Sequence, residues 1–117
     1  MTTEPRWRQL SQPDREREYS PSSLTNDTFE PFVAEYARRS AEARTMANKS
    51  GGPVVELAYG SGPAHTVDLV VPVGNGPFPL FVYIHGGYWQ ALSKRESFFC
   101  ATDCLNAGVA FAAVDYT

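Results

Sequence analysis

The residues of clearest chemical interest form the run His85-Gly86-Gly87-Tyr88-Trp89. This run directly follows Leu80 to Ile84, an apolar stretch, and open α/β sheets bind their ligands at the carboxyl ends of such strands. Glycines leave no side chain between the backbone N–H groups and an approaching oxygen, so these amides could stabilise a developing oxyanion. The alternative is that the glycine pair serves only the bend after the strand.

The elements that must position this run form a β-α-β unit. Leu80 to Ile84 is apolar without alternation, which predicts a central strand covered on both faces. Ser93 and Glu96 have the spacing of a capping box and predict the start of a helix, which Gly108 ends. Val109 to Tyr116 then predicts a second buried strand, so the fold class is α/β.

Two further parts precede this unit. Residues 1–28 have no apolar period and predict an irregular arm, whereas residues 29–50 have the spacing of an amphipathic helix. The runs Val54 to Tyr59 and Thr66 to Val71 alternate, which predicts an antiparallel pair of strands. In the second of these strands, the side chains expected to face inward are Val67, Leu69 and Val71. Three prolines between residues 72 and 79 favour a long loop over a second hairpin.

Composition limits the classes of function. The 117 residues fit one globular domain, and ten basic against thirteen acidic side chains give a net charge of −3, which disfavours nucleic acid or an anionic membrane as a partner. No apolar run is long enough to span a bilayer, and the first residues lack the apolar core of a secretory signal, so we expect a cytoplasmic protein. Cys100 and Cys104 share one helix face, but two ligands make a weak case for zinc, and we predict free thiols and no metal.

The run at residues 85–89 resembles the His-Gly-Gly-x-Trp turn of α/β-hydrolase-fold formamidases and esterases, the kynurenine formamidase (arylformamidase) group especially. Arg17 to Ser23 is similar to the arm of those enzymes, and Val114 to Tyr116 resembles the end of their next strand. The resemblance implies the N-terminal portion of an α/β-hydrolase fold with an incomplete sheet. Residues 1–28 would form the arm and residues 29–117 a partial hydrolase domain.

The resemblance also implies a serine hydrolase that acts on an aryl formamide, similar to N-formylkynurenine, or on a carboxylic ester, without a cofactor. Gly86, Gly87 and Tyr88 would belong to the oxyanion hole, and His85, Tyr88 and Trp89 would line the substrate pocket. An aromatic substrate would suit the two aromatic side chains, although Trp89 could equally fill space beneath the loop. The parent protein could form a homodimer.

The catalytic triad of such an enzyme is absent from this sequence. A nucleophile elbow has the pattern G-x-S-x-G, but Tyr59 stands two residues before Ser61, where this pattern requires a glycine. We therefore assign Ser61 to a turn. His85 is interpreted as a hydrogen-bonded structural residue of its loop, and Asp115 lies too early for the triad acid of the resembled family. We therefore expect the chain alone to be inactive. We also expect it to be poorly soluble, because the resemblance implies further strands beside Leu80 to Ile84, and without them this apolar strand has an open edge. Two alternatives stay open: a module that binds a carboxylate or a partner without catalysis, and a carboxylesterase or lipase-like hydrolase.

Overall fold

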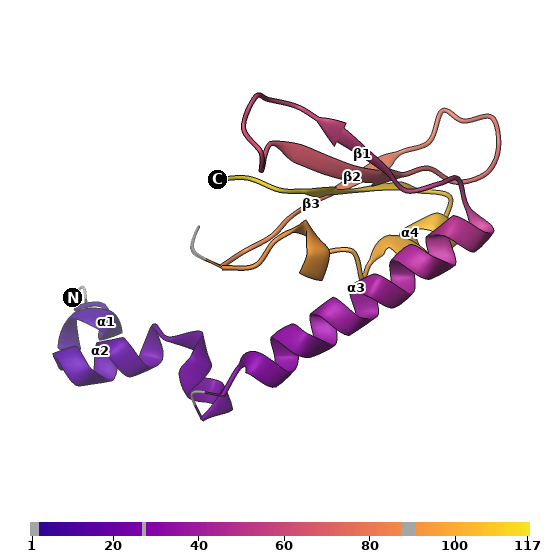
Figure 1. Cartoon of the computed structure of the whole chain (residues 1–117). Coiled ribbons are helices and arrows are strands. Elements are labelled where there is room, and N and C mark those ends of the chain that lie inside the picture. Colours follow the sequence, from indigo (N-terminus) through magenta and orange to yellow (C-terminus); the bar gives the residue numbers. More distant parts are fainter. Residues whose placement is uncertain (1–2, 27, 88–90) are drawn as a thin grey trace. The chain divides into compact units, whose positions relative to one another are not determined.

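The computed structural model describes residues 3–26, 28–87 and 91–117 (Figure 1). The chain divides into two compact units, Met1–Phe32 and Val33–Thr117. The boundary falls within α3 (Glu30–Ser50), the long helix that the spacing of its apolar residues predicted. Among the described residues, no helix is both long enough and apolar enough to cross a membrane.

The first unit contains short helices, so the prediction of an irregular segment was wrong. These are α1 (Arg6–Gln9), α2 (Gln12–Glu18) and the 3-10 helix η1 (Pro21–Thr25). The Ser11 side chain accepts a hydrogen bond from the Asp14 backbone N–H and caps the start of α2. No residue of α1 or α2 is buried, so these helices have no apolar face that periodicity could detect.

The second unit is built on a mixed four-stranded sheet with the order β1-β2-β4-β3. β1 (Val55–Ala58) and β2 (Thr66–Val70) are antiparallel, β2 and β4 (Ala110–Val114) are antiparallel, and β3 (Leu80–Ile84) is parallel to β4. The predicted strand pair and β-α-β unit are therefore confirmed. β2 and β3 are not neighbours, so residues 71–79 form a long loop rather than a hairpin turn.

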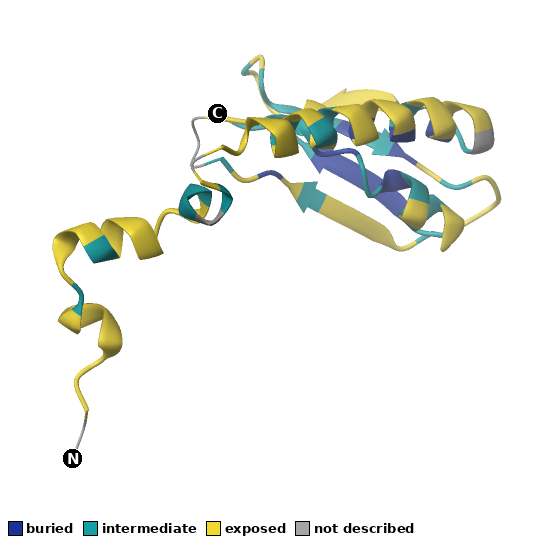
Figure 2. Ribbon diagram, turned by 90° about the horizontal axis from the view of Figure 1, so that it is seen from below, coloured by how far each residue is buried: buried dark blue, intermediate teal, exposed yellow. Residues whose placement is uncertain are grey.

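One face of the sheet is covered by α3 and α4 (Ala101–Asn106), as Figures 1 and 2 show. The core between them consists of Ala43, Ala47, Val70, Phe98, Ala101, Phe111 and Ala113. Val67, Leu69 and Val71 were predicted to face inward from the second strand, and this prediction was wrong. The buried residues of β2 are Asp68 and Val70. A carboxylate can lie on the covered face because Arg44 of α3 pairs with Asp68.

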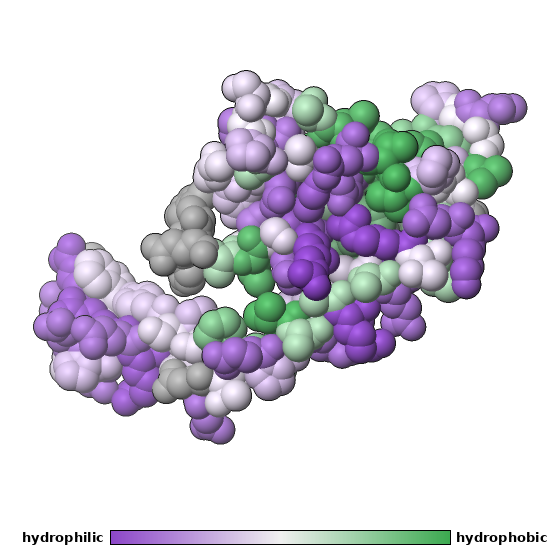
Figure 3. Space-filling view, viewed as in Figure 1, coloured by the Kyte–Doolittle hydropathy of each residue, from purple (hydrophilic) through white to green (hydrophobic). Residues whose placement is uncertain are grey.

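Within the described residues β3 lies at the edge of the sheet, so the cover on both faces that its apolar run predicted is not seen, and its open edge is the one expected of an incomplete sheet. Leu80, Val82 and Ile84 are 54%, 48% and 67% exposed. In the described ranges, both helices lie on the other face of the sheet and no strand pairs with the outer edge of β3. Apolar side chains consequently reach the surface over the sheet (Figure 3).

The segment between β3 and β4 also departs from one continuous helix. Ser93 begins only the 3-10 turn η2 (Lys94–Glu96), where its hydroxyl accepts from the Arg95 N–H and donates to Glu96. The Phe98 N–H then donates to the buried Ser40 hydroxyl of α3, 2.9 Å away, rather than to a helical carbonyl. α4 therefore starts later, while Gly108, with φ of +72°, ends it as predicted.

Candidate functional site

The predicted glycine turn lies at the carboxyl end of β3. Gly87 has a φ of +114°, and a Cβ atom at this position would overlap the backbone carbonyl oxygen of Ala91. Gly86 is exposed, and the space that its Cβ would occupy is open. Gly87 is thus required by the backbone, whereas Gly86 leaves its peptide accessible to a ligand atom. The predicted site residues Tyr88 and Trp89 lie outside the described residues.

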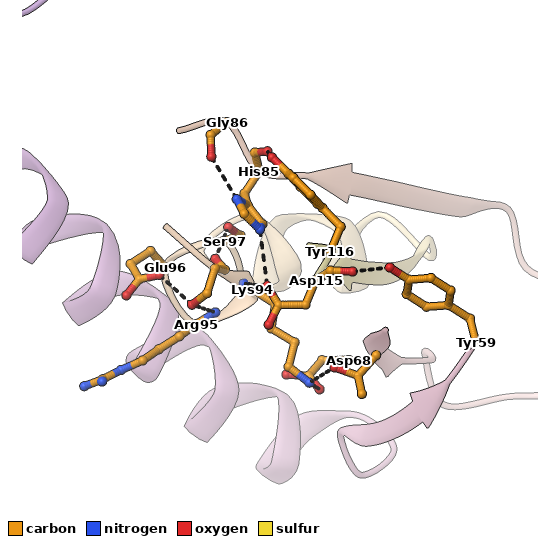
Figure 4. Close-up of polar contacts among 12 residues, drawn as sticks. Tyr59, Asp68, His85, Gly86, Lys94, Arg95, Glu96, Ser97, Asp115 and Tyr116 are labelled. Carbon is orange, nitrogen blue, oxygen red and sulfur yellow. Dashed lines mark hydrogen bonds and ion pairs between the residues drawn. The ribbon is translucent and has the colours of Figure 1, made fainter. Parts of the chain in front are cut away.

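His85 is buried beneath this turn, and both of its ring nitrogens have hydrogen-bond partners. Nδ1 lies 2.8 Å from the carbonyl oxygen of Gly86, and Nε2 lies 3.2 Å from Oδ1 of Asp115 (Figure 4). The ring stacks on Tyr116 with centroids 4.3 Å apart, and the Tyr116 hydroxyl donates to the His85 carbonyl oxygen. The interpretation of His85 as a hydrogen-bonded structural residue of the loop is confirmed.

Asp115 follows β4 and connects it to His85 at the end of β3 and to Lys94 in the segment after the glycine turn. Its Oδ1 also accepts from the backbone N–H of Lys94, 3.0 Å away, and its backbone N–H donates to the Thr66 carbonyl oxygen. The sequence analysis considered Asp115 only as a triad acid and rejected that role. Its contact with His85 follows from the predicted parallel strands, whose carboxyl ends lie at the same edge of the sheet. Because Ile84 pairs with Val114, the residues that come next, His85 and Asp115, lie side by side.

A second polar cluster anchors the segment after the turn to the covered face of the sheet. Lys94 Nζ donates to Asp68, 2.8 Å away, to Thr66 and to Glu56, while Arg44 binds both Asp68 and the Lys94 carbonyl oxygen. Burial by itself would lower the pKa of the Lys94 ammonium, but its hydrogen bonds to Asp68 and Glu56 outweigh burial and raise that pKa. The cluster therefore fixes the position of Lys94, whose backbone N–H donates to Asp115.

Comparison with curated proteins finds similarity to kynurenine formamidases. The chain is 33% identical over 117 residues to the kynurenine formamidase of Salmo salar, with 95% of this chain and 38% of the relative covered. It is 31% identical to the kynurenine formamidase of Danio rerio, again with 95% of this chain and 39% of the relative covered, and 31% identical to that of Drosophila melanogaster over 110 residues, with 88% of this chain and 37% of the relative covered. The chain resembles kynurenine formamidases. These relatives support a formamidase or hydrolase family.

A solved structure agrees with this similarity. The crystal structure of a "putative thioesterase" from Silicibacter matches 71% of this chain and 32% of its own, with a TM-score of 0.57 and 37% sequence identity. No family model matches the chain. The chain spans about two-fifths of the length of the formamidase relatives it matches. The similarity thus concerns the part of those enzymes that corresponds to the glycine turn and the strands around it.

Cys100, Cys104 and Ser61, the other residues considered for chemistry, belong to other segments than the glycine turn. Cys100 and Cys104 are free thiols as predicted, and burial raises the pKa of both. Within the described ranges, no three His, Cys, Asp or Glu side chains are grouped to hold a metal ion. Ser61 is exposed in the loop between β1 and β2, where a turn was predicted.

Proposed function

We propose that this chain is the N-terminal portion of an α/β-hydrolase-fold serine hydrolase that cleaves an aryl formamide similar to N-formylkynurenine. The observation that carries the proposal is the glycine turn at the carboxyl end of β3, with Gly87 at a φ of +114° above the buried His85. The similarity to kynurenine formamidases along nearly the whole chain supports the substrate class.

In the proposed reaction, a serine hydroxyl gives its proton to a histidine and its oxygen attacks the formyl carbon, while the carbonyl electron pair moves onto oxygen. The N–H groups of Gly86, Gly87 and Tyr88 would stabilise this oxyanion, and each such donor typically contributes about a hundred- to a thousand-fold in rate. Collapse of the intermediate expels the arylamine, which takes a proton from a histidine, and water then releases formate from the formyl-serine. This chain supplies the oxyanion loop, and the serine, histidine and aspartate would come from further polypeptide.

The substrate pocket is proposed to include the two aromatic side chains that follow the glycines. Tyr88 and Trp89 suit a flat aromatic substrate, which they would contact by stacking or by edge-to-face packing. His85 is proposed to support the same pocket from behind the turn, since its buried ring holds the Gly86 carbonyl oxygen.

A second candidate substrate class is a carboxylic ester or thioester. The solved structure described as a "putative thioesterase" favours it, because its match covers most of this chain. Esters, thioesters and formamides pass through the same tetrahedral oxyanion, so the glycine turn serves all three. The groups that select among them would lie opposite the turn.

Activity assays on the protein made from its complete reading frame test the proposal. We expect hydrolysis of an aryl formamide with a higher kcat/KM than that of a matched aryl ester or acyl thioester. Preferential hydrolysis of the thioester would support the second candidate, and no hydrolysis of any of the three would refute the enzyme. The 117-residue chain alone should be inactive in all three assays.

A glycine substitution tests the role of the turn itself. We expect Gly87→Ala to lower kcat by about a hundred-fold, because the turn must move to accommodate the added methyl group against Ala91. Gly108→Ala is the matched control: its φ of +72° is also left-handed, so it has similar backbone strain, but it lies at the end of α4. Equal losses of activity in both variants would contradict a special role for the turn.

A further inference from the structure

Asp115 binds both flanks of the glycine turn through one oxygen atom. His85 precedes the glycines and Lys94 follows them, and Oδ1 of Asp115 accepts from the His85 ring and from the Lys94 N–H. Asp115 itself is held by its backbone, since its N–H donates to Thr66 and its carbonyl oxygen accepts from the Tyr59 hydroxyl. The carboxylate therefore fixes the two ends of the turn to the end of β4.

The His85 ring is held at both of its nitrogens. A backbone carbonyl oxygen can only accept, so the contact between Nδ1 and Gly86 requires a proton on Nδ1. At the other side of the ring, Nε2 contacts Oδ1 of Asp115. Gly86 and Asp115 together therefore fix the orientation of this buried ring.

Other charged groups near the ring are already paired. The Lys94 ammonium binds Asp68 and Glu56, and Arg44 binds Asp68, so these four form a cluster of their own. Tyr116 presents its ring face to His85 and donates its hydroxyl proton to the His85 carbonyl oxygen. Among the described residues, Asp115 is thus the carboxylate that faces the ring.

The contact between His85 and Gly86 determines the direction of a neighbouring donor. The carbonyl group of Gly86 and the N–H group of Gly87 belong to one planar peptide unit, in which they point in opposite directions. Because Nδ1 of His85 holds the carbonyl oxygen on the buried side, the Gly87 N–H is turned away from the ring. Loss of the Nδ1 proton would release this peptide unit.

We propose that Asp115 is a positioning residue for the hydrolysis: its contact with Nε2 fixes the His85 ring, and His85 in turn aims the Gly87 N–H at the developing oxyanion. This inference rests on the proposed function. Asp115 does not touch the substrate and exchanges no proton with it. It acts through the orientation of the turn.

The variant that tests this role is Asp115→Asn, in the protein made from its complete reading frame. The side-chain oxygen of asparagine still accepts from the Lys94 N–H, but an amide oxygen is a weaker hydrogen-bond acceptor than a carboxylate oxygen and holds the His85 ring less firmly. We expect kcat on an aryl formamide to fall by about a hundred-fold, since a misdirected group near the reacting atoms has losses of that order. KM should stay within a few-fold, because the turn binds the transition state rather than the ground state.

The matched control is Asp103→Asn, which removes an exposed carboxylate from α4 and should leave kcat unchanged. Nitrogen NMR of the His85 ring gives a second measurement that does not depend on activity. We expect a hydrogen-bonded proton on Nδ1 in the unaltered protein, and faster exchange of that proton with water in Asp115→Asn.

The outcomes separate this inference from the proposed function. An unaltered protein that hydrolyses no formamide, ester or thioester refutes the proposed function and the positioning role with it, while a hydrogen-bonded Nδ1 proton that exchanges faster in Asp115→Asn would still confirm that Asp115 orients His85. An active protein in which Asp115→Asn retains its kcat, or changes KM alone, overturns the positioning role. If Asp115→Asn does not fold, a His85 ring without a proton on Nδ1 in the unaltered protein overturns it instead.

Discussion

At the scale of single residues, Glu35 on α3 is an acid whose pKa is strongly lowered. Hydrogen bonds from Arg38 and Arg39 lower the pKa of its carboxyl group to about 2, from an ordinary 4.5. A lowered pKa means that the ionised, paired form stabilises the fold at neutral pH, and that this contribution is lost as the pH falls from 4.5 towards 2.

We expect carbon NMR of the Glu35 carboxyl group to show a titration midpoint near 2. Arg38→Gln should raise this midpoint, because Arg38 makes the larger contribution to the shift. Lys49→Gln, at the far end of the same helix, serves as the control and should leave it unchanged. An unshifted midpoint in the unaltered protein would contradict the ion pairs.

Tyr116 contributes a ring contact and a hydroxyl hydrogen bond to His85, and the two can be separated. Tyr116→Phe keeps the stacked ring but removes the hydrogen bond to the His85 carbonyl oxygen. We expect the free energy of unfolding in urea to fall by about 0.5–1.5 kcal/mol, the usual net value of such a bond. Tyr19→Phe, whose side chain is exposed, should leave the unfolding midpoint unchanged.

At the scale of elements, Asp68 joins the middle of the sheet to α3 and to the segment after the turn. It lies on β2 and pairs with Arg44 and Lys94, with a side chain that is 9% exposed. Asp68→Ala would leave two cations without their shared anion, and we expect a loss of about 3 kcal/mol of unfolding free energy. The exposed Asp103→Ala is the control, with little expected change.

A double variant tests whether this loss comes from the unpaired cation. Lys94→Met in combination with Asp68→Ala removes both charges, so the double variant should be more stable than the sum of the two single losses predicts. If the two single losses of unfolding free energy add up to the loss in the double variant, Lys94 and Asp68 do not stabilise each other.

At the scale of the whole molecule, the uncovered face of the sheet determines how the 117-residue chain behaves in solution. Val55, Leu57, Leu80, Val82 and Ile84 are all exposed, and β3 presents an unpaired edge within the described residues. Exposed apolar edges pair with other chains, so we expect this chain to self-associate.

Sedimentation analysis of the isolated chain checks this expectation. Ile84→Lys places a charge on the exposed edge strand and should shift the distribution towards monomer. Val73→Lys, in the long loop between β2 and β3, adds the same charge to a residue that is 75% exposed and should have less effect. A monodisperse monomer without either substitution would contradict the expectation.

The sequence by itself determined the features that depend on local pattern. Alternation located β1 and β2, apolar runs located β3 and β4, and Gly108 located the end of α4, because these signals act within a few residues. The glycine turn and the hydrogen-bonded His85 were predicted in the same way, from a run of five residues after a strand. The conformation of Gly87 then confirmed the need for glycine.

Tertiary structure alone decided which faces are covered and which residues meet. An apolar run shows that a strand can be buried, but only the packing of α3 and α4 on one side left β3 exposed and placed Asp68 inward. The helices α1 and α2 escaped prediction because they bury nothing. Asp115 meets His85 through the register of β3 and β4, a contact between residues far apart in the chain. Such contacts depend on sheet order, which no local pattern encodes.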